Sequence, residues 1–416
     1  QAAKKGLDAL SPQWVKPKDA VASQDAMIAA LDAHAGTADN DIIVLPGKDK
    51  AKTLAAVNAA LASGAKTYAA DYRVQFLSHS PMEPMNATAH VTATSCEMWV
   101  STQVPGDMRD ALVKELSLPK DAVKLHLTPV GGGFGRRLQT DYGILAAKAS
   151  KALGVPVKLI WTREEDMTHD FYRPTTVAKL RAALNSDKTI RALDYAGATT
   201  NDRALGGIAW NYAYGDVVLR HKNVSTQAPI GSWRSVDPGI TIFFIESLVD
   251  EIAHGEGLDP LAYRRALLAN NPRGLRVLNA AALMAGWGNA QSGHKQGIAF
   301  FNHHAWGTAV APVIEISVDA RSKITVHKVC CAIDPGIAVN PNQIKAQAEG
   351  GIIMGLSAAL REQITLKDGR VEQTNFDTYP VLRLAQVPQI EVLVMESDDV
   401  PAGGVGEPPV PPVAPA

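Results

Sequence analysis

"DAVKLHLTPVGGGFGRRLQTDYGILAAKASKALGVPVKLIWT", residues 121–162, contains the clearest run of structural signals in this chain. Its first ten residues predict a strand, residues 140–154 predict a helix that ends on a glycine, and residues 155–162 predict a second strand. The glycine-rich stretch PVGGGFGRR, residues 129–137, joins the first strand to the helix. This order of elements indicates a domain in which sheets and helices are mixed.

The glycine-rich stretch has two possible roles. A strand-to-helix junction of this kind can be a tight turn, or it can present backbone N–H groups to an anion or cofactor. Arg136 and Arg137 favour an anionic ligand. The stretch is not a dinucleotide-binding fingerprint, because Arg136 stands where GxGxxG requires its last glycine, and no GK[ST] follows to make a P-loop.

The rest of the chain predicts further helices and hairpins without a regular alternation of the two. Helices are predicted at residues 23–36, 51–64, 241–260 and 342–362, and hairpins at 311–319 with 323–334 and at 362–368 with 370–376. No repeat at a fixed period is visible. We therefore predict an α+β fold of mixed sheets with helices.

Composition excludes several classes of function. Of the 416 residues, 46% are hydrophobic and 20% are charged, and the formal net charge is −1, which is ordinary for a globular protein and argues against a nucleic-acid-binding surface. No apolar run reaches the roughly 18 residues that a membrane span needs. The three cysteines show no CxxC spacing, and the adjacent Cys330 and Cys331 are predicted to be small buried side chains of a strand.

Four short stretches carry side chains that could do chemistry. Glu407 stands between glycines and prolines in GGVGEPPVPPVAPA, and Glu83 stands between Pro81 and Pro84, so rigid backbone restricts both carboxylates. Glu83 can equally be a solvated turn residue. Arg173 and Arg234 each lie beside an aromatic residue, and both can be packed arginine–aromatic contacts.

A metal site built from side chains is not predicted. His303 and His304 are adjacent, which is poor spacing for a shared metal ion, and no HExxH motif or Cys/His cluster is present. A metalloenzyme with this sequence would need a metal that brings its own ligands.

Seven stretches, taken in order, resemble one family. They are HSPMEPMNATAH (79–90), GGGFGRR (131–137), WTREEDMTHDFYRP (161–174), GSWRSV (231–236), ESLVDEIAHGEGLDP (246–260), IDPGIAVNPNQIKAQAEGGIIMGLSAAL (333–360) and GGVGEPPVPPVAPA (403–416). On these stretches the chain is similar to the molybdenum-binding large subunit of the xanthine dehydrogenase/aldehyde oxidase family, and within it to the branch of isoquinoline 1-oxidoreductase β subunits and membrane-bound aldehyde dehydrogenases.

The resemblance implies the cofactor and the division of the chain. The fold expected is that of the cofactor-binding domains of the large subunit, with residues 70–292 as the first molybdopterin-binding domain and 293–416 as an incomplete second one. Residues 1–69 are expected to be the end of a preceding α/β domain and a connector, so the chain resembles a C-terminal portion of a longer subunit. In the family, a pterin dithiolene and small inorganic ligands hold the molybdenum, and the resembling branch implies the cytosine dinucleotide form.

The resemblance also implies roles for individual residues. Glu407 matches the catalytic base that takes a proton from the hydroxyl group on the molybdenum. The expected substrate contacts are Glu83, Arg173, Trp233 and Arg234. The expected cofactor contacts are Gly131, Gly132, Gly133, Phe134, Gly135, Arg136, Gln347, Gly404, Val405 and Gly406. The WRS context of Arg234 departs from the purine-oxidising members, which argues against a purine substrate.

The activity implied is oxidation of an aldehyde to a carboxylic acid with oxygen derived from water. Two alternatives stay open: hydroxylation of an N-heteroaromatic such as isoquinoline or nicotinate, and a non-catalytic structural half of a split subunit. By resemblance, electrons would pass to a small subunit with [2Fe–2S] clusters and then to a membrane-bound cytochrome c subunit with haem c. The chain has neither the cysteine set for such clusters nor a CxxCH motif, so these groups belong to partners. A periplasmic location, with membrane association through a partner, follows from the branch alone.

Overall fold

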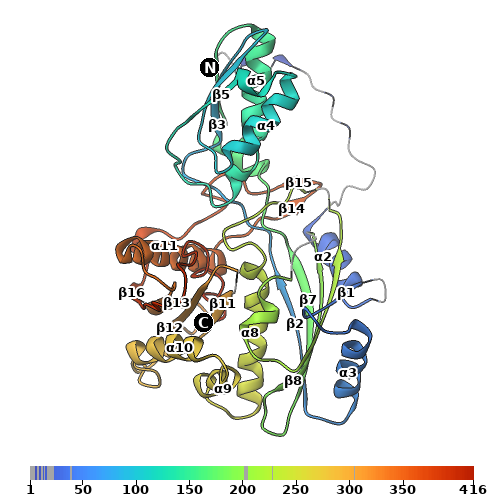
Figure 1. Ribbon diagram of the computed structural model, residues 1–416, viewed down its shortest axis with the longest axis vertical. Coiled ribbons are helices and arrows are strands. Elements are labelled where there is room, and N and C mark those ends of the chain that lie inside the picture. Colours follow the sequence, from blue (N-terminus) through green and yellow to red (C-terminus); the bar gives the residue numbers. More distant parts are fainter. Residues whose placement is uncertain are drawn as a thin grey trace.

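A computed structural model describes residues 23–37, 40–200, 205–226, 228–303 and 305–416, together with isolated positions before residue 23. The chain forms two lobes joined by a narrow connection (Figure 1). We call residues 86–160 the small lobe, and residues 23–74 and 176–416 the large lobe. The two segments that connect them, residues 75–85 and 161–175, form the neck.

The small lobe is one sheet with two helices on one face (Figure 1). Its strands are β3 (Asn86–Val91), β4 (Cys96–Val100), β5 (Val123–Leu127) and β6 (Val157–Ile160), in the order β5-β4-β3-β6. Every second residue of β3 is buried, because α4 (Pro105–Leu116) and α5 (Asp141–Leu153) cover that face of the sheet. The 3-10 turns η1 (Lys120–Ala122) and η2 (Arg136–Leu138) precede β5 and α5. A side chain at Gly143 would not fit between the helices, since its Cβ would lie 2.5 Å from Met108 Sδ.

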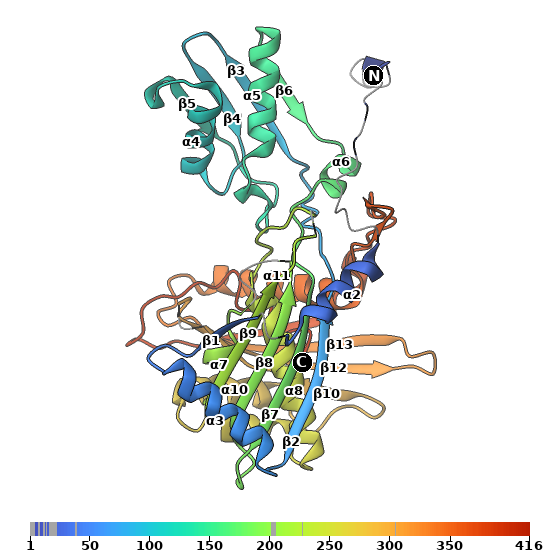
Figure 2. The ribbon, with the colours of Figure 1, turned by 90° about the vertical axis from the view of Figure 1, so that its right-hand side faces the viewer.

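The first sheet of the large lobe is covered on both faces. Its strands are β1 (Asp41–Val44), β2 (Thr67–Val74), β7 (Thr176–Leu184), β8 (Ile190–Thr199) and β9 (Asp216–Asn223), in the order β1-β9-β8-β7-β2. Helices α2 (Gln24–His34) and α3 (Lys50–Ala62) pack on one face, and α8 (Pro238–Gly255) packs on the other (Figure 2). As a result, every residue of β8 except Arg191 is buried.

The second sheet of the large lobe is built from the C-terminal half of the chain. Its strands are β10 (Lys295–Ile298), β11 (Phe301–His303), β12 (Thr308–Val318), β13 (Ile324–Asp334) and β16 (Gln389–Val394), in the order β10-β12-β13-β16 with β11 beside β12. The remaining elements are α6 (Arg163–Thr168) in the neck, α7 (Ile208–Asn211), α9 (Pro260–Leu267), α10 (Pro272–Ala285), α11 (Pro341–Leu360), β14 (Leu366–Lys367), β15 (Arg370–Val371) and η3 (Leu384–Gln386). Side chains of α8, α10, α11, β12 and β13 share one apolar core with the first sheet.

The predicted α+β class is confirmed, and so are the predicted helices and hairpins. The predicted domain boundaries are not those of the structure. Residue 69 lies inside β2, and β1 pairs with β9, so residues 41–69 belong to the sheet of the large lobe and not to a preceding domain. The predicted boundary at residue 292 cuts through the shared core of the large lobe. Most of residues 1–22 lie outside the described residues.

Two further predictions from the sequence concern cysteines and membrane spans. Cys330 and Cys331 are both buried in β13, and both are free thiols, as is Cys96. Within the described ranges, no helix has the length and apolar character needed to cross a bilayer.

A buried ion pair fixes α8 against α9 in the core of the large lobe. Both side chains of the pair Glu246–Arg264 are fully buried, and Arg264 Nε lies 2.9 Å from Glu246 Oε2. The Glu246 carboxylate also accepts hydrogen bonds from Asn211 Nδ2 and from the backbone N–H of Phe300, each at 2.9 Å. Burial raises the pKa of Glu246, while Arg264 and the hydrogen bond from the Phe300 N–H oppose that rise.

Removing the arginine should therefore destabilise the fold strongly. We expect Arg264→Met to lower the free energy of unfolding by about 3–5 kcal/mol, because the Glu246 carboxylate would stay buried without its cation. The neighbouring, exposed Arg265 provides the matched control, and Arg265→Met should change stability by less than about 0.5 kcal/mol. Urea unfolding of the two variants measures both free energies of unfolding. An equal loss in the two variants would show that the Glu246–Arg264 pair does not stabilise the fold.

Candidate functional site

A cavity of about 560 Å³ lies between the two lobes. Loops of the small lobe form one wall, and the large lobe forms the other with the loop before α8, with α11 and with the C-terminal segment. The lining residues are Gln103, Phe134, Gly135 and Leu138 from the small lobe and Ser232, Trp233, Arg234, Val236, Ala346, Gln347, Gly350, Gly406 and Glu407 from the large lobe. Residues from five separate parts of the sequence therefore surround one space.

Glu407 is held by the loop before α8. The backbone N–H of Ser235 donates to Glu407 Oε1 at 3.3 Å, and the Ser235 hydroxyl donates to the backbone carbonyl of Glu407 at 2.7 Å. Among the described residues, no donor bonds to Glu407 Oε2. One carboxylate oxygen is thus fixed, and the other is available to a molecule in the cavity.

The segment that carries Glu407 lies directly on α11. Glycines of the helix make this approach possible, since a Cβ at Gly351 would lie 3.0 Å from Pro409 and a Cβ at Gly355 would lie 2.8 Å from Val413. Four of the five prolines after Glu407 are buried. The rigid backbone predicted around Glu407 therefore packs closely on α11 at the positions of its glycines.

Arg234 joins the C-terminal segment to α11. Its Nε donates to the carbonyl of Gly406 at 2.6 Å, and one Nη donates to the side-chain oxygen of Gln347 at 3.1 Å and to its carbonyl at 3.2 Å. Burial lowers the pKa of Arg234, and the Glu407 carboxylate acts in the opposite direction. Arg234, the predicted substrate contact, and Gln347, the predicted cofactor contact, both line the cavity, but the arginine is already bound to protein oxygens.

Some of the backbone strain of the chain lies around the cavity. Four of the eight described non-glycine residues with positive φ are found there, namely Ser235 (86°), Val236 (48°), Phe134 (56°) and Ser80 (41°). Each such conformation costs on the order of 1–3 kcal/mol and persists only where surrounding contacts impose it. Their position in the two loops that line the cavity, and next to one of them, is typical of a functional site.

The glycine-rich stretch approaches the loop before α8 as closely as two backbones can. Gly135 has φ 116°, and a Cβ there would lie 1.5 Å from the carbonyl oxygen of Ser232, so only glycine fits. A Cβ at Gly131 or Gly133 would meet Glu83 or Gln103 within 2.6 Å. The N–H groups of Gly132, Gly133 and Phe134 donate to no partner within the described part of the chain. They remain available as hydrogen-bond donors beside the cavity.

The expected helix N-terminus is not at the glycine-rich stretch. A 3-10 turn, η2, follows it, and α5 begins only at Asp141, whose carboxylate binds the guanidinium of Arg136 with two hydrogen bonds of 3.0 and 2.8 Å. The arrangement expected for an anion, helix N–H groups pointing at the loop, is therefore absent from this stretch. Its own free N–H groups are the donors that the structure offers instead.

The predictions for Arg136 and Arg137 are corrected by the structure. Both side chains are fully buried, and neither lines the cavity. Arg137 donates to the carbonyl of Gly132 at 2.7 Å and to the Glu83 carboxylate at 2.9 Å, so its charge is neutralised within the protein. The two arginines hold the shape of the loop, because buried cations require partners and find them in their own lobe and in the neck.

Glu83 and Arg173, the other predicted substrate contacts, also lie outside the cavity lining. The Glu83 carboxylate accepts from the N–H of Gly131 at 2.7 Å and from Asn86 at 2.9 Å, in addition to Arg137. Arg173 is buried beneath Trp233, with its guanidinium 5.7 Å from the ring, and burial lowers its pKa to about 10. Their roles as substrate contacts stay predictions without support from this geometry.

The remaining predicted residues divide between lining and support. Trp233, Phe134 and Gly406 line the cavity. Gly404 and Val405 do not line the cavity. The N–H of Gly404 donates to the carbonyl of Trp306 at 2.7 Å, and its carbonyl accepts a hydrogen bond from the Thr308 hydroxyl. Val405 packs against the core of the large lobe. His304 lies outside the described residues, and in the described part of the chain no group of three or more His, Cys, Asp or Glu side chains is placed to hold a metal ion.

Several lining residues were not predicted from the sequence. They are Gln103, Leu138, Ser232, Val236, Ala346 and Gly350. Ser232 and Val236 fall inside the GSWRSV stretch and could have been found by extending that motif. Gln103 follows β4 without any local signal, and only the packing of the lobes brings its side chain to the cavity.

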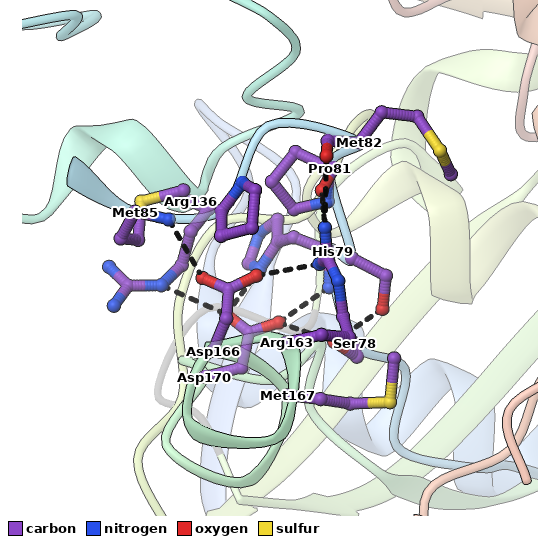
Figure 3. A network of polar contacts seen from close by, with 12 residues as sticks. Ser78, His79, Pro81, Met82, Met85, Arg136, Arg163, Asp166, Met167 and Asp170 are labelled. Carbon is purple, nitrogen blue, oxygen red and sulfur yellow. Dashed lines mark hydrogen bonds and ion pairs between the residues drawn. The ribbon is translucent and has the colours of Figure 1, made fainter. Parts of the chain in front are cut away.

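A network of buried polar side chains lies in the neck, and His79 connects it to Ser232 in the cavity lining (Figure 3). Asp170 accepts hydrogen bonds from the backbone N–H of His79 at 2.6 Å and from the Ser78 hydroxyl at 2.7 Å, and Arg136 Nε lies 3.3 Å from its carboxylate. Burial alone would raise the pKa of Asp170, but His79, Arg136 and these hydrogen bonds outweigh it and hold the pKa at about 2. Nearby, burial and the charge of Asp170 raise the pKa of Asp166 to about 6, although Arg163 pairs with it at 2.8 Å.

Comparison with known proteins identifies relatives over most of the chain. The family described as "Molybdopterin cofactor-binding domain" matches residues 46–268. Isoquinoline 1-oxidoreductase subunit beta of Brevundimonas diminuta is 35% identical over 352 residues, which are 78% of this chain and 44% of the relative. A relative from Gluconacetobacter polyoxogenes, named membrane-bound aldehyde dehydrogenase [pyrroloquinoline-quinone], is 32% identical over 398 residues, which are 83% of this chain and 50% of the relative. The chain thus spans about half the length of these two relatives.

Solved structures share the fold at low sequence identity. Quinoline 2-oxidoreductase from Pseudomonas putida 86 superposes with a TM-score of 0.79 at 16% identity, covering 96% of this chain and 78% of that one. Aldehyde oxidoreductase from Desulfovibrio gigas superposes with a TM-score of 0.74 at 16% identity, covering 91% of this chain and 60% of that one. The arrangement of two lobes is therefore a known one.

The neck network predicts a specific dependence of stability on pH. Since the folded-state pKa of Asp170 lies below its ordinary value, the charged carboxylate stabilises the fold at neutral pH, and this stabilisation is lost as the pH falls through about 4 towards 2. The shift corresponds to about 2 kcal/mol. Asp170→Asn should remove this part of the acid dependence and lower stability at neutral pH.

Urea unfolding as a function of pH measures the effect. The exposed Asp377 supplies the matched control, because Asp377→Asn should leave the acid slope of the wild type unchanged. An Asp170→Asn variant with the full acid slope of the wild type would show that Asp170 is not held charged by the network.

Proposed function

Because the chain belongs to the molybdopterin cofactor-binding domain family, we propose that its cavity binds a molybdenum–pterin cofactor and that Glu407 is the catalytic base of a molybdenum hydroxylase. The observation that carries this proposal is the position of Glu407 at the cavity, with one carboxylate oxygen held by Ser235 and the other free. The relatives in this family that resemble the chain over most of its length are named as oxidoreductases or dehydrogenases.

The residues of the cavity fit such a cofactor. The N–H group of Phe134 and the side-chain amide of Gln347 in the lining, with the N–H groups of Gly132 and Gly133 beside it, offer hydrogen bonds to the polar atoms of a pterin or a pyrophosphate. Glycines at 135, 350 and 406 keep side chains out of the lining at three points. A cavity of about 560 Å³ is large enough for a small-molecule ligand. Glu407 is the one acidic residue among the lining residues, so the lining offers few ligands to a metal ion. This agrees with a cofactor that brings its own metal ligands.

When bound, a molybdenum–pterin cofactor supplies the two-electron oxidation and the oxygen atom that originates from water. The protein's part is to hold this group, to orient the substrate carbon and to move a proton. Glu407 Oε2 is the atom that accepts the proton, and the bond from Ser235 to Oε1 keeps the carboxylate turned towards the cavity. Arg234 holds the backbone on the other side of Glu407 by binding the carbonyl of Gly406.

The substrate proposed is an aldehyde, which would be oxidised to the carboxylic acid. Phe134, Leu138, Trp233 and Val236 make part of the lining apolar, which suits a neutral organic molecule. The charge of Arg234 is already bound by protein oxygens and so offers little to an anionic substrate. The name of the Gluconacetobacter polyoxogenes relative supports an aldehyde as well.

A second candidate is an N-heteroaromatic substrate hydroxylated at carbon. Gln103 favours it, because its side-chain oxygen accepts from the N–H of Gly135 at 3.2 Å, while its amide nitrogen donates to none of the described residues and could bind a ring nitrogen. The relative from Brevundimonas diminuta, named isoquinoline 1-oxidoreductase, points in the same direction.

We further propose, from the family resemblance, the partners and the form of the cofactor. A cytosine dinucleotide form would place its pyrophosphate on the free N–H groups of residues 132–134. Electrons would leave through a small [2Fe–2S] subunit and then a membrane-bound cytochrome c subunit with haem c, in a periplasmic complex. The names of relatives, which include a "subunit beta" and a "membrane-bound" enzyme, support an assembly of several chains at a membrane. Subunit and metal analysis of the native complex tests these points together.

The role of Glu407 is tested by Glu407→Gln in the assembled complex. We expect the turnover number to fall by about 10²- to 10⁴-fold, because glutamine cannot accept the proton, while molybdenum and releasable pterin nucleotide stay at wild-type levels. Glu396→Gln, at an exposed position before the same C-terminal segment, is the matched control and should leave turnover unchanged. Full activity of Glu407→Gln would overturn the assignment and favour a non-catalytic, structural half of a split subunit.

The two substrate classes are separated by a panel of short aldehydes and N-heteroaromatics. We expect aldehydes to be oxidised with the higher kcat/KM, and Gln103→Leu to leave that value within about threefold, because a hydrogen-bond donor to a ring nitrogen is not needed there. Turnover of isoquinoline or nicotinate without turnover of aldehydes, together with a large loss in Gln103→Leu, would assign the heteroaromatic substrate instead.

A further inference from the structure

His79 occupies an unusual position in the neck (Figure 3). Its side chain is fully buried, and each ring nitrogen faces one oxygen atom. Nδ1 lies 2.9 Å from Asp170 Oδ1, and Nε2 lies 2.9 Å from the backbone carbonyl oxygen of Ser232. The ring therefore connects a carboxylate of the neck to the loop that lines the cavity.

The ring is bound on both edges. A carboxylate oxygen faces one ring nitrogen and a backbone carbonyl oxygen faces the other, so the ring has a contact on each side that fixes its orientation. The charged groups closest to the ring are the Asp170 carboxylate, in direct contact, and Arg136, whose Nε lies 3.3 Å from the same carboxylate.

The loop that His79 holds is the loop that holds Glu407. Ser232 accepts from His79, and two residues further on Arg234 binds the carbonyl of Gly406, while Ser235 binds Glu407 through its N–H and its hydroxyl. Trp233 between them donates from its indole to the carbonyl of Ser78 at 3.2 Å. Adjacent residues of the neck thus bind adjacent residues of this loop.

The same contact also sets the opposite wall of the cavity. The carbonyl oxygen of Ser232 packs against Gly135, where a Cβ would lie 1.5 Å from that oxygen and 3.0 Å from His79 Nε2. A shift of Ser232 would therefore move the glycine-rich stretch as well as the loop before α8. A displacement of about 1 Å at a catalytic group can cost about 10²-fold in rate.

We propose that His79, held between Asp170 and the Ser232 carbonyl, is a positioning residue that fixes residues 232–235 and thereby aims the Glu407 carboxylate into the cavity. Its catalytic consequence rests on the proposed function of Glu407. The buried carboxylate, the imidazole ring and the Ser232 carbonyl form one chain of contacts that ends at the two hydrogen bonds from Ser235. His79 touches neither substrate nor cofactor in this arrangement.

Kinetics of His79→Gln and Ser235→Ala in the assembled complex test the proposal. Each variant interrupts the chain of contacts at a different point, and each should lower kcat by about 10- to 100-fold with KM within about twofold, because the base is misplaced while the substrate site is kept. His327→Gln, a half-buried histidine on β13 far from the neck, is the control for the substitution itself and should keep wild-type kcat. Wild-type kcat in both folded variants would overturn the proposal.

Crystal structures of His79→Gln and Asp170→Asn test the positioning directly and do not depend on activity. In each variant that folds, the Ser232 carbonyl should shift and the two hydrogen bonds from Ser235 to Glu407 should lengthen or be lost. Unchanged positions of Ser232 and Glu407 in either folded variant would overturn the proposal. An active Glu407→Gln variant would instead contradict the proposed function, so the two failures are distinguishable.

Discussion

The carboxylate of Asp170 is the contact on which the relative position of the two lobes depends. Asp170 lies on one connector of the neck and accepts hydrogen bonds from Ser78 and His79 on the other, while Arg136 of the small lobe lies 3.3 Å away. A buried charge of this kind is stable only with several partners, and their combined effect holds its pKa at about 2. The charged network thus ties both connectors and the small lobe to one point.

The cavity is a consequence of that constraint. Phe134 and Gly135 of the small lobe meet Trp233, Arg234 and Glu407 of the large lobe because the neck holds the two lobes at this distance. The strained conformations of the lining loops are imposed by contacts with neighbouring segments, including the bonds between Ser235 and Glu407. A site that must hold a carboxylate in one orientation requires rigid supporting contacts. The buried network of the neck and the strained loops that line the cavity provide them.

Elements with strong periodicity could be predicted, whereas those buried on both faces could not. The helices at residues 140–154 and 342–362 and the hairpin of β12 and β13 are where the sequence places them. The central strand β8 carries no alternation, because helices cover both faces of its sheet and bury nearly every residue. Glu407, Gln347 and Phe134 were predicted site residues and line the cavity, whereas Arg136, predicted beside them, is paired inside its own lobe and the neck.

The sequence by itself determined the local elements, the glycines that permit close backbone contact, and one carboxylate on a backbone restricted by glycine and proline. These features depend on a few neighbouring residues, so a local pattern is enough to show them. Only the tertiary structure decided which side chains face the cavity, that Arg137 neutralises Glu83, and that His79 lies between Asp170 and Ser232. Such contacts join residues far apart in the chain, and they depend on the packing of two lobes, which no local pattern encodes.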